Sequence, residues 1–209
     1  MKNSMYWGGF VLGLVVIAWV ALGYVGGSPL ALLMTLLIGV VYLAGAFELK
    51  RFNQATASLS QALASIPDGL PTLDSWILTF HPSLHNAVRL RVEGERVGLP
   101  APSVTPYLVG LLVLLGMLGT FLGMVVTLNG AVLALESTTD LQTIRASLAA
   151  PVKGLGVAFG TSVAGVAASA LLGLMSTLCR RERLQVSQML DSRIATVLRG
   201  FSLAHQRQE

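Results

Sequence analysis

Residues 116–130 read GMLGTFLGMVVTLNG, and residues 154–176 read GLGVAFGTSVAGVAASALLGLMS. Both belong to apolar runs of about 20 residues or more, the length that crosses a bilayer as a helix. Small and hydroxylated residues recur every three or four positions in each stretch, which places them on one helix face. Such faces predict close helix approach, and their hydroxyls can hydrogen-bond across the gap or line a wet path.

The composition of the chain is that of an integral membrane protein. Its 209 residues are 54% hydrophobic and 11% charged, whereas soluble domains carry about 25% charged residues. The length suits one membrane domain. The net charge of +4 is small and dispersed, so nucleic acid is not an expected partner. The single Cys179 excludes a disulfide within the chain.

Four apolar runs predict four membrane spans. The first two, 7–25 and 29–47, are joined by a Gly/Pro-rich turn and predict a tight helical hairpin. A cleaved signal peptide is the alternative for the first run. The third span is expected at 107–135, and the fourth from Pro151, a helix start that tolerates proline, to about residue 178. The predicted fold class is an all-α polytopic membrane protein with four transmembrane helices.

The chain divides into four predicted segments. Residues 1–47 form an N-terminal transmembrane hairpin, and residues 48–106 a cytoplasmic loop with short helices. Residues 107–179 form a second transmembrane helix pair, and residues 180–209 a cytoplasmic C-terminal helix. The second and fourth spans are expected to run on into the cytoplasm as amphipathic helices. The segment 67–71 should break the first of these extensions. A short helix is expected at 83–97, and residues 136–149 are expected to form a polar turn or short helix.

Basic residues set the expected orientation. Twelve of the fourteen Lys and Arg residues fall on one side of the four-span arrangement, and only Arg145 and Lys153 fall on the other. Cytoplasmic segments near membrane spans are enriched in Lys and Arg. Both termini and the middle loop are therefore predicted to be cytoplasmic.

No carboxylate lies inside a predicted span, because Glu48, Glu136 and Asp140 sit at or beyond span ends. Proton carriers usually need a titratable group within the membrane. Either this chain moves no protons, or a partner helix supplies the acid beside a path lined by hydroxyl groups. The alternative is that the small-residue faces only pack helices and the hydroxyls bond their own backbone carbonyls.

The sequence supports other kinds of functional site less well. His81 and His85 have a spacing that can hold a metal, but no third ligand is near in sequence, so we expect no metal site. No dinucleotide or phosphate-loop pattern and no Ser/His/Asp grouping is present, so neither a cofactor nor an enzyme is predicted.

Two short motifs resemble the MotA/TolQ/ExbB proton channel family. The family has a Gly-Thr-x-x-Gly core in the penultimate span, matched by Gly119-Thr120-Phe121-Leu122-Gly123. Its last span has a hydroxyl residue three positions before a glycine, matched by Ser162 and Gly165 with Thr161 in front. The resemblance covers about residues 108–180. The four-span layout is similar to that of the flagellar stator, whereas TolQ and ExbB have three spans.

The resemblance implies a motor in the bacterial inner membrane. Family members form a pentamer around two copies of a single-span partner (MotB/TolR/ExbD-like) that carries an intramembrane aspartate. Thr120 and Ser162 would face that aspartate, with Thr161 beside them, as the ion pathway. Gly116, Gly119, Gly123 and Gly165 would pack the ring, and membrane lipid would surround it.

Ion flow, of protons in preference to sodium, would turn the ring. The cellular task is open between flagellar, envelope and Zorya-type phage-defence roles. The rival hypotheses are a structural membrane scaffold and a non-channel enzyme or transporter subunit. An enzyme would need a polar cluster in the cytoplasmic loop, and the sequence shows none.

Overall fold

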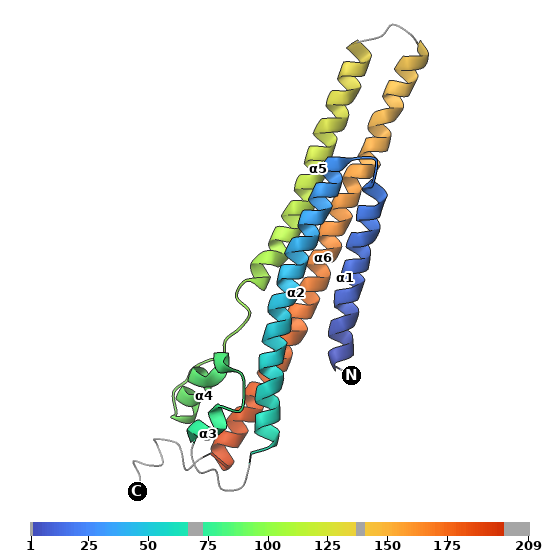
Figure 1. The fold of residues 1–209 in the computed structure, drawn as a ribbon. Helices are drawn as coiled ribbons and strands as arrows, with labels where there is room; N and C mark the ends of the chain where they lie inside the picture. Colours follow the sequence, from blue (N-terminus) through green and yellow to red (C-terminus); the bar gives the residue numbers. More distant parts are fainter. Residues whose placement is uncertain (1, 67–72, 137–140, 199–209) are drawn as a thin grey trace. The chain divides into compact units, whose positions relative to one another are not determined.

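The computed structural model describes residues 2–66, 73–136 and 141–198, without the side chains of 2–5, 133–136, 141–154 and 157. Within these ranges every regular element is helical (Figure 1). The elements are α1 (Lys2–Tyr24), α2 (Pro29–Ala64), α3 (Leu73–Ile77), η1 (Pro82–Leu84), α4 (His85–Val92), α5 (Thr105–Glu136) and α6 (Leu141–Thr196).

The helices α1, α2, α5 and α6 are each long and apolar enough to cross a membrane. This confirms the predicted all-α polytopic membrane fold. Helix α2 has 36 residues and α6 has 56, which correspond to about 54 Å and 84 Å of helix. The hydrocarbon core of a bilayer is about 30 Å thick, so both helices continue well beyond it, as the sequence predicted.

Contacts divide the chain into two compact units. The first unit comprises residues 1–46 and 104–175, and the second comprises residues 47–103 and 176–209. The first holds α1, most of the apolar part of α2, all of α5 and the first part of α6. The second holds the remainder of α2 and α6 together with α3, η1 and α4.

In the first unit, α1 and α2 form the predicted tight hairpin. Its turn contains Gly26 at φ +82°, and the N–H of Gly27 donates to the Tyr24 carbonyl at 3.2 Å. Hydrogen bonds from two tyrosine hydroxyls then join α1 to α2. The Tyr42 hydroxyl lies 3.1 Å from the Gly9 carbonyl oxygen, to which it donates, and the Tyr6 hydroxyl donates to the Ala46 carbonyl at 2.7 Å. Apolar surroundings strengthen such bonds, because no water competes for the carbonyls.

Helix α6 packs against each of the other three long helices within the first unit. Gly45 of α2 leaves room for Leu172, since a Cβ there would lie 2.6 Å from the leucine Cδ2. Gly9 of α1 receives Met175 in the same way, with a 3.1 Å approach to its Cγ. The contacts with α5 are closer still and form the candidate site below.

The second unit has an apolar core of its own, built from α2, α3, η1, α4 and α6. Its buried residues include Leu59, Leu63, Trp76, Phe80, Leu84, Val88 and Leu190. The Trp76 indole N–H donates to the Ala62 carbonyl at 3.2 Å, so the buried ring leaves no polar atom unsatisfied.

Two helix ends differ from the sequence prediction. The helix expected at 83–97 is the short η1 followed by α4, which ends at Val92. Gly94 adopts φ +99°, and Glu95 N–H donates to the Leu90 carbonyl at 2.9 Å, which is a glycine-terminated helix end. Helix α6 begins at Leu141, ten residues before Pro151. Residues 141–150 are rich in good helix formers. The helix continues through Pro151, although a proline inside a helix lacks the N–H donor and its ring crowds the carbonyl four residues earlier.

Candidate functional site

The small-residue faces of α5 and α6 lie directly against each other. We call this contact the glycine seam; it comprises Gly116, Gly119 and Gly123 of α5 and Ala158, Thr161, Ser162 and Gly165 of α6. A Cβ built on Gly116 would lie 3.2 Å from the Gly165 Cα, and one on Gly165 would lie 2.6 Å from the Leu112 carbonyl oxygen. The two backbones are therefore in contact, which only glycine permits.

Thr161 is enclosed by the glycine seam. Its side chain is fully buried, and a Cβ on Gly119 would lie 2.6 Å from the Thr161 Oγ1. The same hydroxyl donates to the Ala158 carbonyl at 2.8 Å. Thr161 thus has its hydrogen bond inside the chain and fills the space over Gly119.

Thr120 and Ser162 lie within about one turn of each other along the seam, and both remain half-buried. The Thr120 hydroxyl donates to the Gly116 carbonyl at 2.9 Å. A Cβ on Gly116 would lie 3.3 Å from the Ser162 Cα, which places Ser162 one turn from Thr120 along the seam. The structure therefore brings the three predicted ion-pathway residues together, with two of the three partly accessible from outside the chain.

The four predicted ring-packing glycines all serve the contact between α5 and α6 of one chain. Gly116, Gly119 and Gly165 are buried and Gly123 is half-buried. A Cβ on Gly123 would lie 2.8 Å from the Ala158 Cβ. Contacts of these glycines with a second copy stay a prediction.

Sequence reasoning gave no role to Ser169 beyond its place in the small-residue stripe. Its hydroxyl donates to the Val109 carbonyl at 2.8 Å and so joins α6 to α5 one turn beyond the Gly165 end of the glycine seam. Ser162, Ser169, Ser176 and Arg183 follow one another at seven-residue intervals. That spacing keeps them on one face of the helix, and it is the signal that points to both Ser169 and Arg183.

Arg183, expected only as one of several topology anchors, is buried in the second unit at 6% exposure. Its Nε donates to the Thr56 hydroxyl at 2.8 Å, and its Nη2 to the Phe52 carbonyl at 3.1 Å. Nη1 donates to the Pro100 carbonyl at 3.3 Å, and the guanidinium stacks over the Phe52 ring. Burial lowers the pKa of Arg183 to about 10, so it remains charged at neutral pH. Arg183 thereby joins α6 both to α2 and to the segment that precedes α5.

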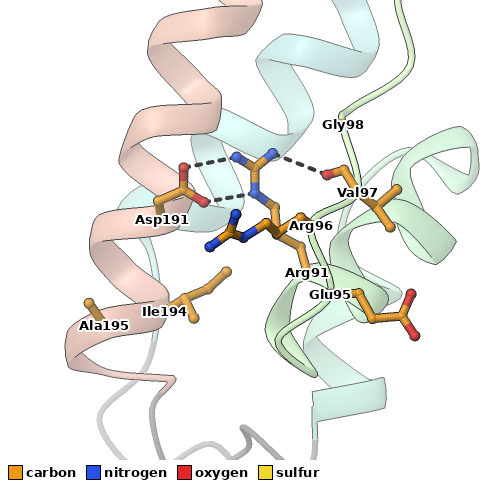
Figure 2. Close-up of a pocket in the computed structure, with 8 residues that line it drawn as sticks. All are labelled: Arg91, Glu95, Arg96, Val97, Gly98, Asp191, Ile194 and Ala195. Carbon is orange, nitrogen blue, oxygen red and sulfur yellow. Dashed lines mark hydrogen bonds and ion pairs between the residues drawn. The ribbon is translucent and has the colours of Figure 1, made fainter. Parts of the chain in front are cut away.

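A shallow pocket of about 430 Å³ lies beside the end of α6 in the second unit (Figure 2). Arg91 closes one wall through paired bonds from Nε and Nη2 to the Asp191 carboxylate, at 2.7 and 2.9 Å. The Arg96 guanidinium lies beside this pair, whereas Glu95 points away. Charges of both signs line the pocket, and no nucleophile lies among its lining residues.

The histidines at 81 and 85 make local bonds instead of converging on one point. The His81 ring accepts from the Ser83 N–H at 3.3 Å, and His85 Nε2 lies 2.8 Å from the Phe80 carbonyl oxygen. Among the described residues no three His, Cys, Asp or Glu side chains group as a metal site would require.

No family model, curated protein or solved structure matches this chain. The interpretation of the site therefore rests on its residues and their geometry.

Proposed function

We propose that the chain is the ring subunit of an ion-driven motor of the MotA/TolQ/ExbB type in the bacterial inner membrane. Five copies surround two copies of a single-span partner whose intramembrane aspartate carries the ion. Ion passage, of protons in preference to sodium, turns the ring about the partner. Neither an enzymatic reaction nor a cofactor is part of this proposal.

The glycine seam is the observation that carries the proposal. It gathers Thr120, Thr161 and Ser162 within about one helical turn, and two of these hydroxyl residues are half-buried at its edge. No Asp or Glu occurs in residues 105–135 or 141–175 of the two helices that form the seam. Residues 2–47 likewise contain no Asp or Glu, so a carboxylate at that level would come from another chain, as a partner aspartate would.

The chemistry of the site follows from what hydroxyls can do. Thr120 and Ser162 can each accept a bond from a water or from a protonated carboxyl group through the lone pairs of the hydroxyl oxygen. They do not titrate near neutral pH, so they can guide a proton or a water chain but cannot store the charge. The Thr120 bond to the Gly116 carbonyl satisfies its donor while leaving lone pairs to accept.

Hydroxyl removal tests the proposal. Thr120→Ala and Ser162→Ala should each abolish proton flux into vesicles that contain the chain and its single-span partner, without loss of the assembled complex. Thr35→Ala is the matched control, because Thr35 is fully buried and makes the same local bond, to the Ala31 carbonyl at 2.8 Å. Wild-type flux in both seam variants would refute the ion-pathway role.

A structural scaffold is the second candidate function, and one observation favours it. All four seam glycines are engaged within a single chain, as ordinary helix packing requires. A scaffold predicts a chain that purifies without an acid-bearing partner and tolerates both hydroxyl removals. Mass measurement of the detergent-purified complex separates the two candidates, since the motor requires five copies with two of the partner.

A further inference from the structure

Four basic residues lie where the two longest helices leave their apolar segments. They are Lys50 and Arg51 of α2 and Arg180 and Arg181 of α6, which we call the basic belt. The bonds from Arg183 to Phe52 and Thr56 set the register of these two helices within the second unit. Lys50 and Arg51 directly precede Phe52, and Arg180 and Arg181 lie within one turn before Arg183. The four cations therefore occupy neighbouring turns of the two helices.

The belt cations do not use the carboxylates of the described chain. All four side chains are exposed. The salt bridges made by described residues join Arg89 to Asp74 and Arg91 to Asp191. Glu48, the carboxylate nearest in sequence to Lys50, accepts from the Ser103 N–H at 3.1 Å. The belt therefore presents four exposed cations, and the half-buried Glu182 is the carboxylate next to Arg181 in sequence.

On α2 the belt continues an exposed apolar stripe. Leu43, Phe47 and Arg51 follow at four-residue intervals and share a face, on which Leu43 is 45% and Phe47 is 56% exposed. The Arg51 guanidinium lies 4.5 Å from the centre of the Phe47 ring. It thus folds back along the helix toward the apolar segment instead of extending away from it.

On α6 an exposed leucine likewise precedes the basic pair. Leu174 is 55% exposed, and Arg181 lies seven residues later on the same helix face. Each helix thus offers an apolar strip that suits an acyl chain and ends in a cation at the level where a headgroup would sit.

We propose that the basic belt is a binding surface for the headgroups of anionic phospholipids, with the acyl chains along the exposed strips of α2 and α6. Lipid is the occupant that fits, because an adjoining apolar strip and an unpaired cation match the two ends of one such molecule. This inference goes beyond the motor proposal and does not depend on it.

The test compares two lipids with the same acyl chains, one with an anionic headgroup and one with a zwitterionic headgroup. The chain, purified alone in a neutral detergent, is titrated with short-chain phosphatidylglycerol and with phosphatidylcholine of the same chain length. Bound lipid is counted by native mass spectrometry. We expect preferential binding of phosphatidylglycerol, weakened by added salt. Glycerol phosphate, which carries the charge without acyl chains, should compete poorly; full competition would assign the surface to a soluble phosphate and overturn the lipid proposal.

Charge-matched variants localise the effect. Arg51→Gln/Arg181→Gln should weaken phosphatidylglycerol binding roughly 30-fold, from the contribution of two surface cations. Arg96→Gln/Arg193→Gln removes the same charge but should retain wild-type binding, since Arg193 lies about 18 Å further along α6. If the belt pair fails to fold, Lys50→Gln/Arg180→Gln takes its place. Equal binding of the two lipids by the wild type, or equal losses in the belt and control variants, would overturn the proposal. Either failure leaves the ion-flux test of the motor unaffected.

Discussion

Gly165 is the residue that sets how closely α5 and α6 approach. A Cβ there would meet the Leu112 carbonyl oxygen at 2.6 Å and the Gly116 Cα at 2.8 Å. Both neighbours are backbone atoms, which cannot rotate away as a flexible side chain would. Even one methyl group must therefore push the two helices apart.

We expect Gly165→Ala to lower the free energy of unfolding by about 1–3 kcal/mol, the usual cost of overpacking. Gly110→Ala is the control, because Gly110 lies in α5 with no atom within 4 Å of a Cβ position. It should be neutral or stabilising by about 0.5–1 kcal/mol, since alanine favours helix. Denaturant unfolding in detergent measures both, and equal stability of the two variants would contradict the backbone contact.

Arg183 shows what a residue-level interpretation of the sequence misses. It is one of three arginines after the last apolar run, Arg180-Arg181-Glu182-Arg183, and composition cannot distinguish it from the other two. Only the packing of α2 beside α6 shows that it is buried while Arg180 and Arg181 are exposed. Its seven-residue spacing from Ser176 is the one sequence feature that separates it from them.

Arg183→Met should destabilise the protein by about 3 kcal/mol, because it leaves the Phe52 and Pro100 carbonyls and the Thr56 hydroxyl without their buried donor. It should also expose residues 98–104 to limited proteolysis. Arg180→Met removes the same charge from an exposed site and should change neither measurement. A wild-type cleavage pattern in the Arg183 variant would show that the bonds do not hold this segment.

At the scale of elements, helix existence was predictable and helix ends were not. The extension of α2 to Ala64 follows from its amphipathic pattern, and the structure confirms it. The end of α4 at Val92 depends on the left-handed backbone of Gly94. A glycine in the sequence does not by itself indicate that its φ will be positive. The break expected at 67–71 lies outside the described residues.

Gly94→Ala tests the end of α4. A side chain at φ +99° is strained by about 1–2 kcal/mol, so we expect a loss of that size in unfolding free energy. Gly98→Ala provides the comparison, since Gly98 also has open space around it but no positive φ. If the two substitutions cost the same, the strain at Gly94 is not what ends the helix.

At the scale of the whole molecule, an even number of spans predicts that both chain ends lie on one side of the membrane. The distribution of basic residues predicts that this side is the cytoplasm. In a Cys179→Ser background, Gly27→Cys should react with a membrane-impermeant maleimide in intact cells. Gly98→Cys should react only after permeabilisation; both positions have open space for the new side chain. The reverse labelling pattern would invert the proposed orientation.

The candidate site was only partly predictable from the whole sequence. Periodicity placed Thr120, Thr161 and Ser162 on small-residue faces, but a period does not say which neighbour covers a face. The structure shows that α5 and α6 cover each other, so Thr161 is enclosed while Thr120 and Ser162 stay half-buried.

The tyrosine bonds of the α1–α2 hairpin bear on how the protein is made. The bonds from Tyr6 to Ala46 and from Tyr42 to Gly9 join residues that are 40 and 33 positions apart. All four residues have been synthesised once the ribosome has passed position 46, before any of α5 exists. Because N-terminal parts fold first during synthesis, the hairpin can insert and close on its own. The later helices then pack against a hairpin that has already formed. A stalled nascent chain that ends near residue 90 should therefore already contain the closed α1–α2 hairpin.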